Sequence, residues 1–319
     1  MLGLPTSGFQ RSIKKDNVSL IKLCDWIESS LLFIGEPISR RDIIDTLCEN
    51  GIYIDQDFAA TKLEDVWATL RWRIRTLGKS SPIIVRKNRL DRIVESWQEA
   101  PAHSFCMLLS MPGLYKNWSN RLMNDYNVQG ELFEFLSKES IEAKLFDWSV
   151  NLTGWSRTKP EKLPDVVKSV AKLINEPIGD LEKWSNGHEN EAGLDLICLK
   201  EFGDSRPGLP TFFFQCASGM NWKEKLKAPD LSVWRRFIDF SVHELPRKGF
   251  TLPYALSDGD FIRTANRTEG LLMDRYRLLA MPGSSPNWTS DKLGENLINW
   301  CKPLVTQLPE FNEQGTHFF

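Results

Sequence analysis

The 319-residue chain has no run of about 18 apolar residues, so it offers no candidate for a membrane-spanning helix. Its first residues lack the charged segment and apolar core of a signal peptide. The six cysteines form no C-x-x-C pair and the four histidines stand singly, so the spacing of a structural zinc site is also missing. These absences predict a cytoplasmic protein whose cysteines are reduced core residues.

Charge of the two signs is nearly balanced, but it is unevenly distributed along the chain. The 40 Lys and Arg against 42 Asp and Glu give a net charge of -2, which by itself argues against a nucleic-acid partner. Residues 71–92, however, hold eight basic side chains against Asp91 alone, a net charge of +7, so the remainder of the chain is net -9. The 41% hydrophobic and 26% charged composition excludes a disordered chain. The positive charge is therefore one local patch on a folded protein.

The segment that contains this patch has the pattern of a winged helix-turn-helix domain. Apolar residues at helical spacing predict helices over residues 18–34 and 57–77, and the capping-box pair Ser39 and Asp42 starts a shorter helix between them. A short apolar strand and its return predict a hairpin over residues 82–94. In such a domain the third helix enters the major groove and the hairpin contacts the DNA backbone.

The basic side chains of the third helix and the hairpin are the candidate nucleic-acid contacts. They are Arg71, Arg73, Arg75, Lys79, Arg86, Lys87 and Arg89. Contacts of this kind would bind phosphates, tolerate changes of base sequence and weaken with salt. Two other interpretations are a solvated basic face and a winged helix that binds a protein partner. The predicted domain covers residues 1–98, and a helical connector covers residues 99–127.

Two apolar strands in the second half of the chain each contain one polar side chain. Asp195 interrupts the apolar run 194–199, and Gln215 interrupts the run 211–217. Burying a polar group is costly unless it has a partner, so a shared task is one interpretation. A carboxylate, an amide oxygen and a nearby lysine fit a Mg²⁺ or Mn²⁺ site that hydrolyses a phosphodiester. The structural alternative is that Asp195 ends a strand in a turn and Gln215 satisfies neighbouring backbone.

Short motifs around these residues resemble the PD-(D/E)XK, or restriction-endonuclease-like, superfamily, most closely its Mrr-type branch. They are Phe133-Glu134 in a helix, Gly193-x-Asp195 before an apolar strand and Gln215-Cys216 at the end of the next strand. The likeness covers about residues 128–256 and implies an α/β fold in which helices flank a mixed sheet. The nuclease-like domain is expected to span residues 128–319, with a helical C-terminal extension that includes a helix over residues 271–278.

The resemblance implies a Mg²⁺-dependent DNA endonuclease of a prokaryotic defence system, with DNA and a protein of that system as partners. On this basis Asp195 and the backbone carbonyl of Cys216 would ligate the metal. Glu134 would bind it through water, and Gln215 would replace the usual acidic residue. A winged helix before such a core is also similar to Mrr-type enzymes. Cutting both strands of a duplex would suggest a homodimer.

One residue departs from the pattern of this family. The family's lysine should lie two residues after Gln215, where the sequence has Ala217. The lysine has moved to Lys225 or Lys223 in the next helix, or Ala217 is an engineered replacement of a lysine, or the fold is degenerate and acts as a DNA-binding or partner-recruiting subunit. The run Gln-Cys-Ala-Ser-Gly-Met-Asn-Trp-x-x-Lys resembles one in uncharacterised bacterial proteins of this type, which favours Lys225.

Overall fold

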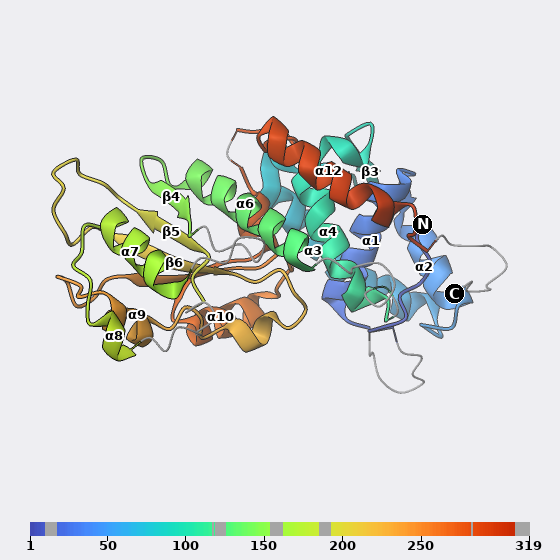
Figure 1. Ribbon diagram of the computed structural model, residues 1–319. Coiled ribbons are helices and arrows are strands. Elements are labelled where there is room, and N and C mark those ends of the chain that lie inside the picture. The colour runs from blue at the N-terminus through green and yellow to red at the C-terminus, as the bar shows by residue number, and fades with distance from the viewer. Residues whose placement is uncertain are drawn as a thin grey trace. The chain divides into compact units, whose positions relative to one another are not determined.

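The computed structural model describes most of the chain, namely residues 1–9, 18–116, 118, 126–153, 162–184, 193–281 and 283–309. The chain forms two compact units. The first consists of Met1–Asn124 with Leu279–Phe319, and the second of Asp125–Leu278. Both units combine helices with strands (Figure 1). No helix in the described ranges is long and apolar enough to cross a membrane.

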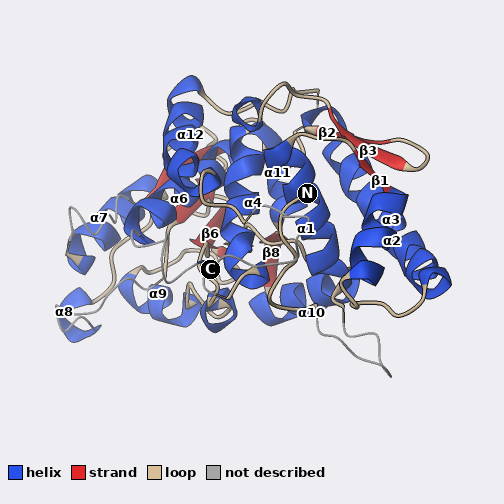
Figure 2. Cartoon of the chain, turned by 90° about the vertical axis from the view of Figure 1, so that its right-hand side faces the viewer, coloured by secondary structure: helices blue, strands red, loops and turns tan. Residues whose placement is uncertain are grey.

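The first unit contains five helices and one small sheet among its described residues. The helices are α1 (Leu20–Ile34), α2 (Arg40–Glu49), α3 (Gln56–Leu77), α4 (Pro101–Leu114) and α12 (Asp291–Val305), with the 3₁₀ turns η1 (Gly78–Ser80) and η2 (Trp97–Glu99). The strands are β1 (Ile38–Ser39), β2 (Ile83–Val85) and β3 (Arg89–Arg92), all antiparallel and in the order β1-β3-β2. Figure 2 shows β2 and β3 as a hairpin with β1 at its side. The predicted order of three helices and a hairpin is confirmed, while β1 was not predicted.

Local signals account for these elements. Ser39 and Asp42 form the predicted capping box: the Asp42 N–H donates to the Ser39 hydroxyl at 3.1 Å, and the Ser39 N–H donates to the Asp42 carboxylate at 2.8 Å. The predicted apolar stripe of α3, which includes Leu63, Trp67 and Leu70, is buried. The helix begins where sequence periodicity places it and packs inward as expected.

The last helix of the chain belongs to the first unit. α12 packs against α4, where the rings of Phe105 and Trp300 meet edge to face with centroids 4.8 Å apart. The predicted division differs, because it made 99–127 a connector and placed 279–319 with the nuclease-like part. α4 is instead almost wholly buried in the first unit. Residues 119–125 of that connector lie outside the described residues.

The second unit is built on one five-stranded sheet. Its strands are β4 (Ser149–Leu152), β5 (Leu196–Leu199), β6 (Thr211–Cys216), β7 (Arg247–Thr251) and β8 (Gly270–Met273). Its helices are α6 (Tyr126–Lys144), α7 (Leu163–Leu173), α8 (Leu181–Trp184), α9 (Leu231–Phe237), α10 (Asp258–Thr268) and α11 (Arg275–Leu279), with the 3₁₀ turn η3 (Trp222–Lys225). The sheet order follows the chain; β4, β5 and β6 are antiparallel, and β6, β7 and β8 are parallel.

Helices cover both faces of this sheet. On one face α6 contacts the strands through a hydrogen bond of 2.9 Å between the Ser137 and Thr251 hydroxyls. On the other face α7 and α9 enclose an apolar core in which Phe213 and Trp234 meet edge to face with centroids 5.3 Å apart. The elements can be followed in Figure 1. The predicted α/β fold, a helical region with a small sheet followed by a mixed sheet flanked by helices, is confirmed.

The helix predicted over residues 271–278 is wrong for its first half. Gly270–Met273 forms β8, parallel to β7, and the helix begins only at Arg275. A short apolar run has no periodicity that separates a buried strand from a helix. At Gly270 a Cβ atom would lie 2.4 Å from the carbonyl oxygen of Lys248, so the close approach of the two strands requires glycine.

Candidate functional site

The start of β5 and the end of β6 bring Asp195 and Gln215 together. The two strands are antiparallel with Leu196 opposite Phe214, so Asp195, which precedes β5, lies opposite Gln215. The Asp195 N–H donates to the Phe214 carbonyl oxygen at 2.9 Å and continues the ladder. Gln215 is 5% exposed and Asp195 is half-buried. The two polar side chains noted in the sequence therefore occupy one place in the fold.

The Asp195 carboxylate and the Cys216 carbonyl converge on one side-chain amide. Oδ2 of Asp195 accepts a hydrogen bond from the Cys216 backbone N–H at 2.5 Å and another from the Gln215 amide. The same Gln215 nitrogen lies 3.4 Å from the Cys216 carbonyl oxygen. One donor thus contacts both oxygens that were predicted as metal ligands. In the structure the Gln215 amide thus satisfies both oxygens, as in the structural alternative, and a cation bound by these oxygens would have to displace it.

Gly193 makes room for this arrangement. Its φ of +65° lies in the left-handed region, and a Cβ atom would lie 2.6 Å from the Ala228 Cβ and 3.1 Å from the Gln215 amide oxygen. A side chain here would be strained and would displace Ala228 or Gln215. The Gly193-x-Asp195 motif thus has a local cause: the glycine lets the chain pass close to Gln215 just before Asp195 enters the sheet.

Glu134 faces the same end of the sheet from α6. Burial raises the pKa of the Cys216 thiol well above its usual range, and the charges of Asp195 and Glu134 raise it further. Hydrogen bonds from Thr251 and Ser137 act in the opposite direction. The charges of both carboxylates act on this one thiol. The strand register brings Asp195, Gln215 and Cys216 together, whereas a role of Glu134 at the same site stays a prediction.

The oxygen atoms at this site are of the kind that Mg²⁺ and Mn²⁺ prefer as ligands. Within the part of the chain that the structure describes, no three His, Cys, Asp or Glu side chains form a metal cluster. Mg²⁺ is usually held by one or two carboxylates, and water and substrate phosphates complete its six ligands. Asp195 and the Cys216 carbonyl, with Glu134 further away, supply such a partial set. The residues therefore fit a hard divalent cation whose remaining ligands would be water molecules or substrate oxygens.

The position of the family's lysine is apolar. Ala217 is 0% exposed and packs with Trp222, Leu226 and Phe250. Burying an ammonium group among these side chains would be costly, which favours a native alanine over a substituted lysine. The helix that was predicted to carry Lys223 and Lys225 is the single turn η3. The Lys225 side chain is exposed there and, among the described residues, makes no ion pair with an acid. Lys223 is engaged differently, because its ammonium lies 5.5 Å from the Trp222 ring centroid.

Three polar residues beside the site were missed by sequence reasoning. Ser218 follows β6, and its carbonyl oxygen accepts hydrogen bonds from the Gln129 amide at 3.2 Å and from the Tyr254 hydroxyl at 2.6 Å. Gln129 is 3% exposed and lies on the buried stripe of α6 with Phe133. A polar residue on an otherwise apolar helical stripe was the available signal for Gln129. No local pattern marked Tyr254.

The basic surface lies in the first unit. Its exposed cations are Arg71 and Arg75 on α3, Lys79 in η1, and Arg86, Lys87 and Arg89 on the β2–β3 hairpin. In the hairpin, the guanidinium groups of Arg86 and Arg89 both pair with the Asp91 carboxylate, at 2.5 Å and 2.8 Å. One carboxylate thus holds two exposed guanidinium groups side by side. Six of the seven predicted contact residues are on the surface, and two of these six, Arg86 and Arg89, are paired with Asp91.

Arg73 is the exception, and the prediction that it contacts nucleic acid is wrong. Its side chain is 1% exposed, and Nη1 lies 2.8 Å both from the Asp25 carboxylate and from the Glu28 carboxylate of α1. Two residues along a helix correspond to about 200° of rotation, so Arg73 faces away from Arg71. The helix that exposes the basic surface therefore buries this one arginine as the centre of an internal ion cluster.

Comparison with known proteins finds one weak structural similarity. No family model matches the chain, and no curated protein matches it. Among solved structures, a match is found to the restriction endonuclease FokI bound to DNA, with 10% sequence identity and a TM-score of 0.19. The match covers 84% of this chain and 45% of the other, so the chain spans less than half the length of that protein. The similarity is weak, and the candidate site rests on its own geometry.

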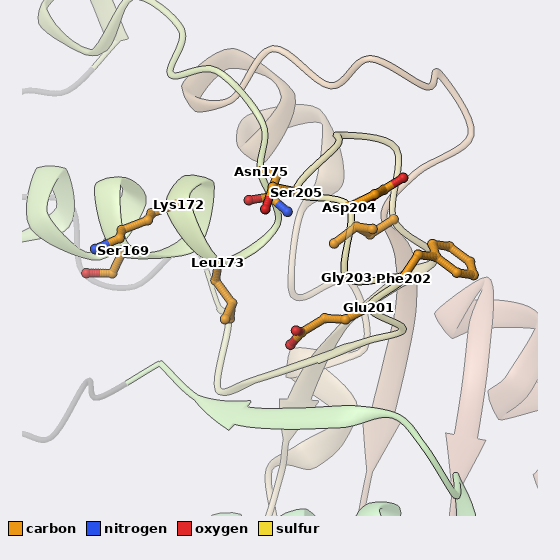
Figure 3. Close-up of a pocket in the computed structure, with 10 residues that line it drawn as sticks. Ser169, Lys172, Leu173, Asn175, Glu201, Phe202, Gly203, Asp204 and Ser205 are labelled. Carbon is orange, nitrogen blue, oxygen red and sulfur yellow. The ribbon is translucent and has the colours of Figure 1, made fainter.

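A hollow of about 460 Å³ lies elsewhere in the second unit (Figure 3). It is formed by the last turns of α7 and the loop after β5, and exposed side chains such as Lys172, Glu201 and Asp204 line it. These loop residues follow the end of β5, whereas Asp195 precedes its start. The hollow is therefore separate from the cluster of Asp195 and Gln215.

Proposed function

We propose that the chain is a metal-dependent DNA endonuclease in which Asp195 and the Cys216 carbonyl hold Mg²⁺ or Mn²⁺ and Glu134 contributes through water. The observation that supports this most is the Gln215 amide nitrogen, which contacts Asp195 Oδ2 and faces the Cys216 carbonyl at 3.4 Å. When bound, the ion supplies a Lewis acid for a phosphate oxygen and lowers the pKa of a water molecule. The experiment that tests the proposal is cleavage of a plasmid in the presence of these metals.

The protein residues would orient the reacting groups. The Cys216 N–H fixes one carboxylate oxygen of Asp195, so the second oxygen keeps a defined direction. A bound cation would displace the Gln215 amide nitrogen from its present position. A 180° flip of the amide would then present the side-chain oxygen to the cation instead of the nitrogen. Glu134, on the other element that faces this end of the sheet, would then order water.

A second candidate function is a nuclease-like fold that binds DNA or recruits a partner without cutting. The observation in its favour is Ala217, which is fully buried where the family pattern places a lysine. The two functions differ in one measurable property. Both predict DNA binding by the basic surface, but only the first predicts that bound DNA is cut when metal is added.

Lys225 is proposed to supply the ammonium that Ala217 lacks. Its turn adjoins the site, because Ala228, three residues later, fills the space beside Gly193. Lys225→Ala is expected to reduce the cleavage rate about 10²-fold, as for the loss of a group that assists proton transfer. Lys223→Ala, a neighbouring charge removal in the same turn, should leave the rate within about threefold. Equal rates for Lys225→Ala and the unsubstituted chain would exclude Lys225 from the reaction.

The exposed arginines of α3 are proposed to bind the phosphate backbone. Reversing the charge of two of them, Arg71→Glu with Arg75→Glu, is expected to weaken DNA binding at least tenfold and to lower the slope of log affinity against log salt by about two. Gel shifts or fluorescence anisotropy at several salt concentrations would measure this. Lys292→Glu with Lys302→Glu makes the same charge change on the exposed side of α12. Equal losses in both double variants would show a nonspecific effect of net charge.

A further inference from the structure

The Ser218 carbonyl is held by side chains from two separate segments of the second unit. The Gln129 amide, near the start of α6, donates to the carbonyl oxygen and to the Ser218 hydroxyl, both at 3.2 Å. The Tyr254 hydroxyl, from the segment after β7, donates to the same carbonyl oxygen at 2.6 Å. Gln129 and Ser218 are buried, so the hydrogen bonds between them are shielded from water. The low dielectric of the interior makes such bonds electrostatically stronger than they would be in water.

The segment that carries Tyr254 is itself fixed from inside the unit. Arg275 is 0% exposed, and its Nε donates to the Pro253 carbonyl oxygen at 2.9 Å. The Arg275 backbone N–H donates to the Tyr254 carbonyl oxygen at 3.2 Å. The Tyr254 hydroxyl therefore approaches Ser218 from a backbone that a buried arginine holds in place.

These bonds act at the point where β6 ends. The Ala217 N–H still donates to the Thr251 carbonyl oxygen at 2.9 Å, which continues the pairing with β7 by one residue. The Cys216 carbonyl belongs to the same peptide group as this N–H, so the bond to Thr251 holds it from one side. Two residues further on, the Ser218 carbonyl is held by Gln129 and Tyr254. The backbone that follows the Cys216 carbonyl is thus anchored at both ends, which restricts the rotation of its peptide group.

We infer that Gln129 and Tyr254 are positioning residues that aim the Cys216 carbonyl oxygen at the cation site beside Asp195. This inference rests on the proposed function, because it takes that carbonyl to be a metal ligand. Neither side chain contacts the cation. When either hydrogen bond is lost, the backbone from Cys216 to Ser218 relaxes and the carbonyl oxygen is less well directed. The cation then binds more weakly, although Asp195 is unchanged.

Calorimetric titration of the full chain with Mn²⁺ tests the inference through Tyr254→Phe, which removes one oxygen atom and keeps the ring. Binding is expected to weaken about tenfold, at the low end of the effect of groups that orient metal ligands. Tyr115→Phe is the matched control, since the Tyr115 hydroxyl donates to the Gly3 carbonyl oxygen, also at 2.6 Å, within the first unit. It removes an equivalent hydrogen bond and should leave Mn²⁺ affinity unchanged.

Gln129→Met is a second variant that tests the inference independently of Tyr254→Phe. Thermal unfolding checks that each variant is folded. Because both side chains act on one carbonyl, the double variant should weaken Mn²⁺ binding by less than the product of the single effects. Unchanged affinity in both single variants would overturn the inference, and the proposed function would stand if Asp195→Asn still abolished binding. If the unsubstituted chain bound no Mn²⁺, the proposed function would fail and this inference with it.

Discussion

Asp195→Asn is expected to reduce metal-dependent cleavage of DNA by about 10³-fold or more, within the range for loss of a group that acts directly in a reaction. The substitution removes the negative charge that would hold the cation. It keeps an oxygen that accepts the hydrogen bond from the Cys216 N–H, which Asp195 now receives at 2.5 Å. The fold should therefore survive. The rate at which supercoiled plasmid disappears in Mg²⁺ measures the effect, and circular dichroism checks the fold.

A matched control for this prediction comes from the same unit. Asp204→Asn makes the identical chemical change on an exposed loop that lines the separate hollow. It should leave the cleavage rate and the unfolding temperature unchanged. If Asp195→Asn retained full activity, or if Asp204→Asn lost as much, the assignment of the reaction to the Asp195 site would be wrong.

Arg73→Met is expected to destabilise the protein by about 3–5 kcal/mol, the cost of removing one partner from a buried ion pair. Asp25 and Glu28 would keep their buried negative charges without the guanidinium that now lies 2.8 Å from each. The free energy of unfolding, measured with urea, would report the loss. The effect is large because two buried carboxylates of one helix pair with the same guanidinium group of another.

Arg71→Met is the control on the exposed side of the same helix, two residues away. Its free energy of unfolding should change by less than about 0.5 kcal/mol, as for ordinary surface substitutions. The effects on DNA affinity should be reversed. Arg71→Met should reduce the affinity, whereas the folded fraction of Arg73→Met should bind DNA as well as the unsubstituted chain. A loss of less than about 1 kcal/mol in Arg73→Met would contradict the buried ion cluster.

Several features of the fold and of the candidate site could be predicted from the sequence because they are local or follow from strand direction. The capping box of Ser39 and Asp42 is a contact between residues three apart. Asp195 and Gln215 meet because successive antiparallel strands place the start of one beside the end of the other. Gly193 is explained by its positive φ next to Gln215. Motif spacing and strand direction were sufficient for this part of the account.

Other features depend on contacts between distant residues, which periodicity does not encode. Arg73 has the same charge as its neighbours, and only the acids of α1, 45 and 48 residues away, show that it is internal. α12 returns to α4 through a contact between Phe105 and Trp300. The Tyr254 hydroxyl reaches Ser218 across 36 residues. Such pairings are settled by packing in three dimensions, so the sequence predicted the elements and not their partners.

The central claim is that the cluster around Asp195 is a divalent-cation site that cleaves nucleic acid, and a plasmid assay on the unsubstituted chain tests it most directly. Supercoiled plasmid incubated with Mg²⁺ or Mn²⁺ should become nicked or linear, and EDTA should prevent this. Asp195→Asn assayed in parallel excludes a contaminating nuclease, because only activity that disappears with Asp195 belongs to this site. Plasmid that stays intact with every metal would contradict the account and favour the second candidate function, in which the fold does not cut DNA.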